Sequence, residues 1–287
     1  MITWDSDLVS DIARRRCVLF LGAGVSRSSV NAQGKSPKTW EAFLNDCANG
    51  IHPNAHILKL IRRGDFLTAC EVAKMQLGRD RFTQKLKDEF LTPQYRHAAI
   101  HEHIFKIDSR IVATPNFDKI YESYANHLAH ASIVVKHHYD PDVADAIRDD
   151  GHIILKIHGS IDSPNRMIFT RSEYAKARNE HRQFYHLLDA LALTHTFMFL
   201  GCGVNDPDIK LLLEDAFFRH PTSRRHVMVL PKKEIHPEVL KVVENTMNLK
   251  ILEYSPTNNH KDLTDSLSTL VTQVENRRDD LRKSGNW

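Results

Sequence analysis

The stretch Cys17-Val-Leu-Phe-Leu-Gly-Ala-Gly-Val-Ser26 decides the fold of this chain. Its apolar run, Val18 to Leu21, is typical of a strand that is buried on both faces of a parallel sheet. Gly22 and Gly24 follow directly, and glycine allows a sharp turn and lets a ligand approach the main chain without a Cβ in the way. Free N–H groups at the start of a helix favour anions, so the stretch predicts a nucleotide cradle whose helix Ser26 could cap.

An ordinary strand-to-helix turn is the alternative, because a short Gly-x-Gly pattern occurs often. A dehydrogenase-type dinucleotide site has Gly-x-Gly-x-x-Gly, but Arg27 stands at the third glycine position. The Gly-x-x-x-x-Gly-Lys-Ser/Thr phosphate loop is absent too, so a kinase-like or ATPase-like site has no support. Residues 28–37 are rich in Ser, Asn, Gly and Pro, which predicts a long, mobile loop over the ligand.

Composition narrows the class of protein. The 287 residues suffice for one large α/β domain, or for one domain with a sizeable insertion. The net charge of +3 is spread evenly, so we expect no direct nucleic-acid binding. The cysteines at 17, 47, 70 and 202 are expected to be buried free thiols, and no common zinc spacing occurs, so no metal is expected. No signal peptide and no run of ~20 apolar residues is present, which predicts a cytoplasmic protein without a membrane span.

Strand and helix patterns alternate along most of the chain. From about Thr39 to His103, apolar residues recur at three-or-four spacing, which predicts helices alone. Elsewhere we expect strands at 110–114, 132–136, 152–157, 196–200, 226–230 and 249–253, a short strand or hairpin arm at 167–169, and long helices at 171–195 and 260–283. The pattern predicts an α/β fold with a doubly wound, Rossmann-like parallel sheet. We assign residues 1–38 and 106–287 to that domain and residues 39–105 to an all-helical insertion.

Four of the predicted strands end in polar or glycine-rich signatures. These are Gly22-Ala-Gly-Val-Ser26, Thr114-Pro-Asn-Phe-Asp118, Lys156-Ile-His-Gly159 and Leu200-Gly-Cys-Gly-Val-Asn-Asp206. Each has an ordinary structural explanation, since Asn116, Asp118 or Asp206 can cap a helix and His158 can be a loop histidine. Ligands of open parallel sheets bind outside the carboxyl ends of the strands, so the four together predict one site.

The four motifs, in this order, resemble the sirtuin-like (SIR2-like) NAD-binding family, and specifically its bacterial anti-phage defence branch. The resemblance covers about residues 17–270, and Lys35-Ser-Pro-Lys-Thr-Trp40 resembles the loop that this branch places after its glycine turn. The chain lacks the four-cysteine zinc module and the cofactor-loop Asp-Phe-Arg of sirtuin deacetylases. The resemblance therefore implies a sirtuin-type fold and hydrolysis of NAD+ to nicotinamide and ADP-ribose, with deacetylation in doubt.

The resemblance also implies roles for single residues. His158 would contact the ribose hydroxyls or act as general base, Asn116 would orient the nicotinamide ribose or the attacking water, and Asp118 would support that loop. The other implied NAD+-binding residues are Gly22, Ala23, Gly24 and Ser26 at the diphosphate, Gly201 and Asp206 nearer the adenosine ribose, and Thr114 and Gly159. Nicotinamide is already a cationic leaving group, so the cleavage needs no proton donor and no metal.

Two other functions stay open: a catalytically silent NAD+ or ADP-ribose sensor or scaffold, and a protein ADP-ribosyltransferase or residual deacylase. An NAD-depleting effector has to be restrained, and 287 residues leave little room for a built-in sensor, so we expect activation by assembly. The resemblance implies a homo-oligomer or a protein partner such as a HerA-type DNA-translocating ATPase or a short Argonaute. The helical insertion is the surface we nominate for subunit contacts, with a lid over the NAD+ cleft as the alternative.

Overall fold

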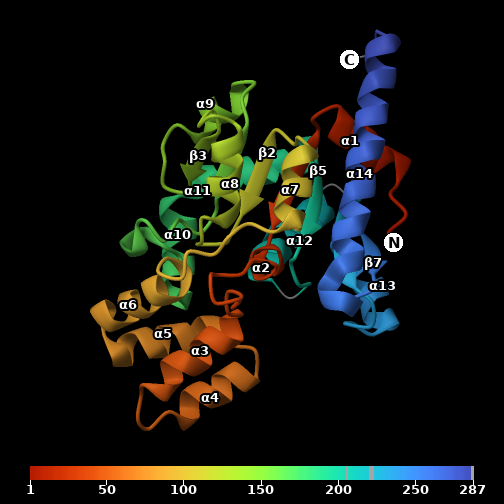
Figure 1. Ribbon diagram of the computed structural model, residues 1–287. Coiled ribbons are helices and arrows are strands. Elements are labelled where there is room, and N and C mark those ends of the chain that lie inside the picture. The colour runs from red at the N-terminus through yellow and green to blue at the C-terminus, as the bar shows by residue number, and fades with distance from the viewer. Residues whose placement is uncertain (205, 220–222, 286–287) are drawn as a thin grey trace.

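The computed structural model describes residues 1–204, 206–219 and 223–285, and its centre is a parallel sheet (Figure 1). The strands are β1 (Cys17–Leu21), β2 (Ile111–Thr114), β3 (Val134–His137), β4 (Ile153–Lys156), β5 (Thr196–Leu200), β6 (His226–Pro231) and β7 (Leu249–Tyr254). Among the described residues these seven strands form one sheet in the order β3-β4-β2-β1-β5-β6-β7, and every neighbouring pair is parallel. The predicted doubly wound α/β sheet is confirmed, and the winding reverses between β1 and β5.

Helices cover both faces of the sheet (Figure 1). One face carries α1 (Ser6–Ala13), α7 (Ala99–Lys106), α8 (Ile120–Leu128) and α14 (Thr257–Lys283), and the other carries α9 (Val143–Arg148), α11 (Arg182–Thr194), α12 (Pro207–Arg219) and α13 (Pro237–Thr246). Successive side chains of a strand point to opposite faces, so Leu19 and Leu21 of β1 join the first core, while Val18 and Phe20 join the second. Burial of β1 on both faces explains its unbroken apolar sequence.

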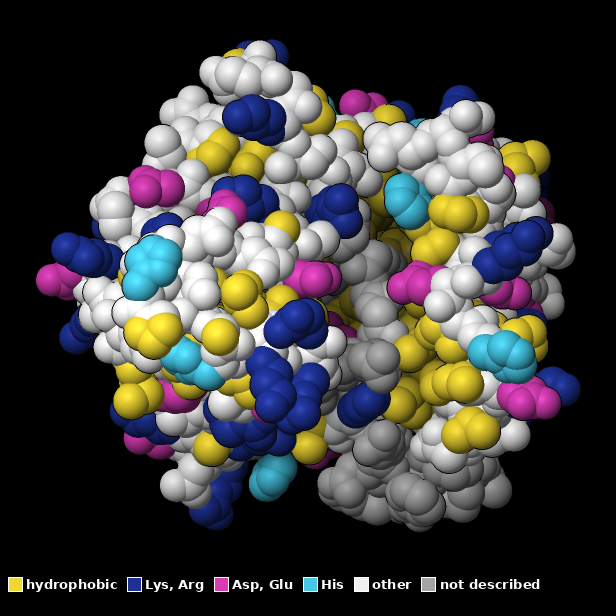
Figure 2. All heavy atoms as spheres, turned by 90° about the horizontal axis from the view of Figure 1, so that it is seen from below, with side chains coloured by type: hydrophobic (Ala, Val, Ile, Leu, Met, Phe, Trp, Pro, Cys, Tyr) yellow, Lys and Arg dark blue, Asp and Glu magenta, His cyan; other side chains and the backbone are white. Residues whose placement is uncertain are grey.

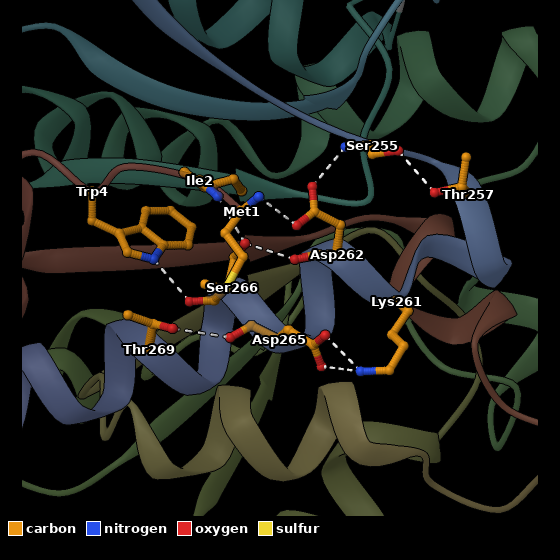
Figure 3. Close-up of polar contacts among 10 residues, drawn as sticks. All are labelled: Met1, Ile2, Trp4, Ser255, Thr257, Lys261, Asp262, Asp265, Ser266 and Thr269. Atoms are coloured by element: carbon orange, nitrogen blue, oxygen red, sulfur yellow. Dashed lines mark hydrogen bonds and ion pairs between the residues drawn. The ribbon is translucent and has the colours of Figure 1, made fainter.

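The N-terminal residues bind α14 through polar contacts (Figure 3). The amino group of Met1 lies 2.7 Å from Oδ1 of Asp262. The backbone N–H of Ile2 donates to Oγ of Ser266 at 2.9 Å, and the indole N–H of Trp4 donates to the Ser266 carbonyl at 2.8 Å. These bonds hold the segment before α1 on α14. The first and last helices of the described chain therefore pack together on the same face of the sheet.

Between β1 and β2 the chain is helical, as predicted, but it forms two packing groups. After the short α2 (Ala23–Arg27), the helices α3 (Trp40–Asn49), α4 (Ala55–Arg62), α5 (Phe66–Leu77) and α6 (Arg79–Phe90) share a core that includes Phe43, Phe82 and, from the loop after β4, Phe169. In contrast, α7 packs on α14, and its Ile100 and Ile104 belong to the core of the sheet. The division of the chain at residues 39–105 stays a prediction.

Two local expectations were wrong. Residues 171–195 form two helices, α10 (Arg171–Glu180) and α11, because the backbone of His181 leaves helical geometry where its ring packs edge-on against His138. The segment 167–169 is not a strand: it follows a single 3-10 turn (Pro164–Arg166), and Ile168 makes one backbone bond to the carbonyl of His158. Both features depend on contacts with distant parts of the chain. Within the described ranges, no helix has the length and apolar character that a membrane crossing needs.

Candidate functional site

The four strand ends that the sequence singles out lie side by side, because β4, β2, β1 and β5 are consecutive neighbours in the sheet. A cavity at this edge is lined by the predicted residues Ala23, Ser26, Asn116, Asp118, His158 and Asp206, together with Asp208, Tyr174, Lys38 and several aromatic side chains. Seen from below, the molecule is hollowed between two lobes, and hydrophobic and acidic side chains border the hollow (Figure 2). Asn205 of the fourth motif lies outside the described residues.

The glycine turn after β1 packs directly on the glycine turn after β5. Gly22 N–H donates to the Leu200 carbonyl at 2.8 Å, and Gly24 N–H donates to the Gly201 carbonyl at 2.9 Å. A Cβ on Gly22 would lie 2.5 Å from the Gly201 oxygen, and one on Gly24 would lie 2.8 Å from the Gly201 Cα. The glycines are therefore required for the contact between two turns, whatever ligand approaches them.

We expected that Ser26 could cap α2, but it does not. The residue that precedes the helix is Gly22, and Ser26 is buried inside α2, where its hydroxyl donates to Oδ2 of Asp118 at 2.7 Å. The amide Nδ2 of Asn116 donates to the Gly22 carbonyl at 2.9 Å and to Oγ of Ser26 at 3.0 Å. The glycine turn and the Thr114–Asp118 loop are thus one hydrogen-bonded unit.

The base of this loop is fixed by two further residues. Oγ1 of Thr114 donates to the Leu21 carbonyl at 2.7 Å and accepts from Asn116 N–H at 3.1 Å, which ties β2 to β1. Below the loop, the ammonium group of Lys156 is fully buried, donates to the Asp118 carbonyl at 2.5 Å and lies 3.1 Å from Oε2 of Glu122. A buried lysine needs such partners, so the loop conformation and this ion pair depend on each other.

His158 is buried, with 5% of its surface exposed, so it is not an exposed loop histidine. Its ring lies between Phe117 and Tyr174, at centroid distances of 6.1 and 4.9 Å. Nε2 lies 2.9 Å from Oδ2 of Asp208, and the Tyr174 hydroxyl donates to the same oxygen at 3.1 Å. The Tyr174 oxygen is also 3.5 Å from Nδ1 of His158. His158, Asp208 and Tyr174 therefore form a buried polar cluster on one wall of the cavity.

Two carboxylates stand close together at the start of α12. Asp208 N–H donates to Oδ1 of Asp206 at 3.0 Å. Burial and then the charge of Asp208 raise the pKa of the half-buried Asp206. Burial alone would raise the pKa of Asp208 as well, but His158 and the hydrogen bond from Tyr174 lower it. Asp208 is therefore the carboxylate that stays ionised beside His158.

A second cavity lies on the other side of the paired glycine turns, at the ends of β5, β6 and β7. It is lined by Gly24, Arg27, Gly201, Pro231, Tyr254 and His260, among others. Nδ1 of His260 lies 2.9 Å from the Tyr254 hydroxyl. Gly201 borders this cavity, but Asp206 borders the cavity of His158, so the two residues we grouped near an adenosine ribose lie on opposite sides of the turns.

The segment between α2 and α3 is a loop without a helix or a paired strand, as expected, but it is fastened at both ends. Arg96 N–H donates to the Val30 carbonyl at 2.9 Å. At the other end, Oε1 of Glu89 accepts from Lys38 N–H at 2.8 Å, and its Oε2 lies 3.1 Å from the Lys38 ammonium. These bonds do not support our expectation of a mobile loop.

The expected buried thiols are confirmed, since Cys17, Cys47, Cys70 and Cys202 are all free and buried. In the part of the chain that the structure describes, no group of three or more His, Cys, Asp or Glu side chains is arranged to hold a metal ion.

Sequence reasoning missed Asp208, Tyr174 and Lys156 as members of the site. Asp208 had a signal, because it is the second acid of the sequence Asp206-Pro-Asp208, of which we considered only Asp206, as a possible helix cap and site residue. Lys156 stands inside a quoted motif, and a lysine at the end of an apolar strand could have been recognised as a buried, paired charge. Tyr174 had no signal, since only the packing of α10 brings it to His158.

Comparison with known proteins agrees with this geometry. Residues 110–252 match the family model of the SIR2-like domain. The chain is 27% identical over 225 residues to the NAD(+) hydrolase ThsA of Enterococcus faecium, an alignment that covers 77% of this chain and 44% of that protein. It is 22% identical over 242 residues to the NAD(+) hydrolase ThsA of Bacillus cereus (strain MSX-D12), covering 82% and 47%. The chain thus spans about half the length of the curated relatives it matches.

Proposed function

This chain carries a SIR2-like domain, and from that premise we propose that it is an NAD+ glycohydrolase, which cleaves NAD+ to nicotinamide and ADP-ribose. The observation that carries the proposal is the pair of cavities on either side of the two packed glycine turns. Two adjoining cavities suit a dinucleotide, whose halves are joined by a diphosphate. The names of the relatives, which are NAD(+) hydrolases, support the same substrate.

In this proposal the nicotinamide riboside half occupies the cavity of His158 and the adenosine half occupies the cavity of Gly201. The diphosphate crosses the glycine turns at Gly22, Ala23 and Gly24. Ala23 N–H donates to no group in the described ranges, whereas the N–H groups of both glycines bond to the β5 turn. We therefore expect fewer backbone bonds to the diphosphate than a free helix terminus would give.

The chemistry fits the side chains around the first cavity. Departure of neutral nicotinamide leaves positive charge on the ribose, and fixed carboxylates near the ring stabilise such charge in a site that excludes water. Asp118 and Asp208 border the cavity, as does Asp206, whose raised pKa makes it the weaker source of negative charge. Phe117, Trp40 and Phe169 supply apolar walls that suit the nicotinamide ring and limit the entry of water.

His158 and Asn116 are the residues we propose to act directly. His158 accepts a proton from the attacking water or from a ribose hydroxyl, and Asn116 orients the nicotinamide ribose or the water. Both Nδ2 protons of Asn116 are already donated, to Gly22 and Ser26, so its Oδ1 is the atom available to a ligand. Asp118 and Thr114 hold the loop, and Gly159 follows His158 with a φ of +81° that favours glycine.

We further propose that the protein depletes NAD+ in anti-phage defence, and that assembly with itself or with a partner activates it. ThsA is named an NAD(+) hydrolase, and the resemblance of the four motifs is to the defence branch. The partner classes named above, a HerA-type ATPase or a short Argonaute, stay proposals. A silent NAD+ sensor, and a transfer of ADP-ribose to protein, are the alternatives that an experiment has to separate.

The test is to incubate the purified chain with radiolabelled NAD+, with and without candidate protein acceptors, and to separate the products by chromatography. We expect equal amounts of nicotinamide and free ADP-ribose. His158→Ala should lower the rate at least about 100-fold, the scale of general acid–base catalysis. The control is His56→Ala, an exposed histidine on α4, which should react like the wild type.

Three outcomes would contradict the proposal. Intact NAD+ bound without turnover would indicate a sensor, and ADP-ribose attached to protein would indicate a transferase. Wild-type turnover in a folded His158→Ala variant would remove His158 from the mechanism. Because His158 is 5% exposed, circular dichroism and thermal unfolding of each variant must accompany the kinetics.

A further inference from the structure

We propose that Asp208 is a positioning residue that fixes the tautomer of His158, so that the proton sits on Nε2 and Nδ1 is the basic nitrogen. Tyr174, in turn, fixes Asp208. This inference rests on the proposed function for its catalytic meaning, but the tautomer itself is a property of the protein without substrate. Neither Asp208 nor Tyr174 is among the site residues predicted from the sequence, and both act through His158.

The first step is the enclosure of Nε2. This nitrogen has no contact with solvent and, within the described chain, no aligned hydrogen bond, while Oδ2 of Asp208 lies 2.9 Å away. The contact is one of charge rather than of an aligned hydrogen bond: a proton on Nε2 lies beside the carboxylate charge and is attracted to it, whereas a lone pair there is repelled. Water or a ribose hydroxyl cannot reach an enclosed atom. Nδ1 is therefore the nitrogen left to accept a proton.

The second step is a count of protons between Tyr174 and its neighbours. Burial and the charge of Asp208 raise the pKa of Tyr174 well above its usual value, so its hydroxyl keeps its single proton. That proton is donated to Oδ2 of Asp208 at 3.1 Å, so it is not available to Nδ1 of His158, at 3.5 Å. A proton on Nδ1 would have only the neutral Tyr174 oxygen as acceptor, at 3.5 Å, whereas a proton on Nε2 lies beside the charged Oδ2 of Asp208, with 2.9 Å between the two heavy atoms; the charge and the shorter distance favour Nε2–H.

The third step compares Asp208 with the other groups near His158. The titratable and charged groups that face the ring or its partners are Asp206 and Asp208 of α12, Tyr174 and Arg178 of α10, and His138 after β3. Burial, with its histidine neighbours, lowers the pKa of His138 to about 3, so it carries no charge near neutral pH. The pKa of Asp206 is raised and that of Asp208 is lowered. Asp208 is therefore the ionised group in contact with the ring.

The direct experiment is nuclear magnetic resonance of the substrate-free protein labelled with 15N in histidine. Two-bond proton–nitrogen correlations distinguish Nε2–H from Nδ1–H, and the His158 signals are those that His158→Ala removes. We expect the Nε2–H tautomer in the wild type and a shift toward a mixture in Asp208→Asn. The matched control, Asp145→Asn, removes an exposed carboxylate on α9 and should leave the signals unchanged.

Kinetics supply the second readout. Loss of a group that orients a functional histidine typically costs about 10- to 100-fold, and we expect this loss in kcat of Asp208→Asn with KM for NAD+ within about threefold of wild type. Tyr174→Phe should show a smaller loss in kcat and the same split between kcat and KM.

The outcomes separate the inference from the proposed function. An Nδ1–H tautomer in the wild type, or unchanged His158 signals in Asp208→Asn, would overturn the inference even if NAD+ is cleaved. If the wild type cleaves no NAD+ but the Nε2–H tautomer is lost in Asp208→Asn, the inference about the tautomer stands and the proposed function is wrong. If Asp208→Asn does not fold, Tyr174→Phe decides: unchanged His158 signals and an unchanged kcat in that variant would count against the cluster.

Discussion

Gly201 is the residue on which the two glycine turns depend. Its φ is +67°, in the left-handed region, and a Cβ added to it would lie 2.5 Å from the backbone nitrogen of Val25. Two constraints therefore favour glycine at position 201: the left-handed backbone conformation and the close approach of α2. Gly201 lines the second cavity, and α2, which it contacts, also carries Ala23 and Ser26 of the first cavity, so the residue helps to position both halves of the proposed NAD+ site.

Gly201→Ala should destabilise the fold strongly. Left-handed strain and overpacking against backbone each cost about 1–3 kcal/mol, so we expect the free energy of unfolding to fall by roughly 2–6 kcal/mol. Gly203→Ala is the matched control, because Gly203 lies in the same turn, has no left-handed φ, and a Cβ there would meet nothing within 4 Å. Urea denaturation of both variants measures the difference, and equal stability would show that the turns tolerate a side chain.

Single residues also show where sequence reasoning reaches its limit. The motifs predicted Asn116, Asp118, His158 and the glycines because their residue types are unusual at strand ends. Their hydrogen-bond partners could not be predicted, since Ser26 meets Asp118 only after β1 and β2 pair. That Asp206 lines the cavity of His158 could not be predicted either, because a position in the chain does not say which cavity a side chain borders.

Among the structural elements, α3–α6 and the loop before them form the wall of the site opposite the sheet. Trp40 and Phe43 of α3 and Phe90 of α6 line the cavity, and Phe169, from the loop after β4, joins their core. The helical periodicity of this segment was visible in the sequence. Its attachment was not, because Lys38, Tyr95 and Glu89 are brought together by packing alone. Likewise, the break between α10 and α11 follows from the contact of His181 with His138.

Glu89→Ala should free the loop that precedes α3. Glu89 is 7% exposed and accepts from Lys38 N–H and from the Tyr95 hydroxyl, so its removal takes away the acceptor of two partly buried hydrogen bonds that hold the loop. We expect trypsin to cleave after Lys35 several times faster in Glu89→Ala than in the wild type, and KM for NAD+ to rise.

The control for this experiment is Glu41→Ala, which removes an exposed glutamate from the first turn of α3. It should be cut at the wild-type rate. Equal cleavage rates for Glu89→Ala and the wild type would mean that Glu89 does not restrain the loop, and rapid cleavage of the wild type itself would restore the expectation of a mobile segment.

For the molecule as a whole, the strand order explains why separate motifs become one site. The sequence predicted alternating strands and helices, which restricts the sheet to a parallel one, and ligand binding at the carboxyl ends then follows. The order β4-β2-β1-β5 adds what the pattern did not contain: the motif-bearing strands are neighbours, and the winding reverses between β1 and β5. A crevice at such a reversal is where open α/β sheets bind nucleotides.

The remaining prediction concerns assembly, which we propose as the restraint on activity. Constitutive hydrolysis would exhaust the NAD+ of the host, so the dilute chain should be weakly active and its specific activity should rise with protein concentration or with a partner. The anchored loop argues against loop ordering as the trigger.

The helices α3–α6 remain the surface we nominate, and Met75 on α5 is 75% exposed there. We expect Met75→Glu to weaken self-association and to lower activity at a given concentration, whereas Val239→Glu, which changes a 49% exposed residue on α13, outside the helices α3–α6, should not. NAD+ turnover measured against concentration, with mass determined by light scattering, tests the prediction. Full specific activity from a demonstrated monomer would exclude assembly as the switch and leave access of NAD+ to the His158 cavity as the step to examine.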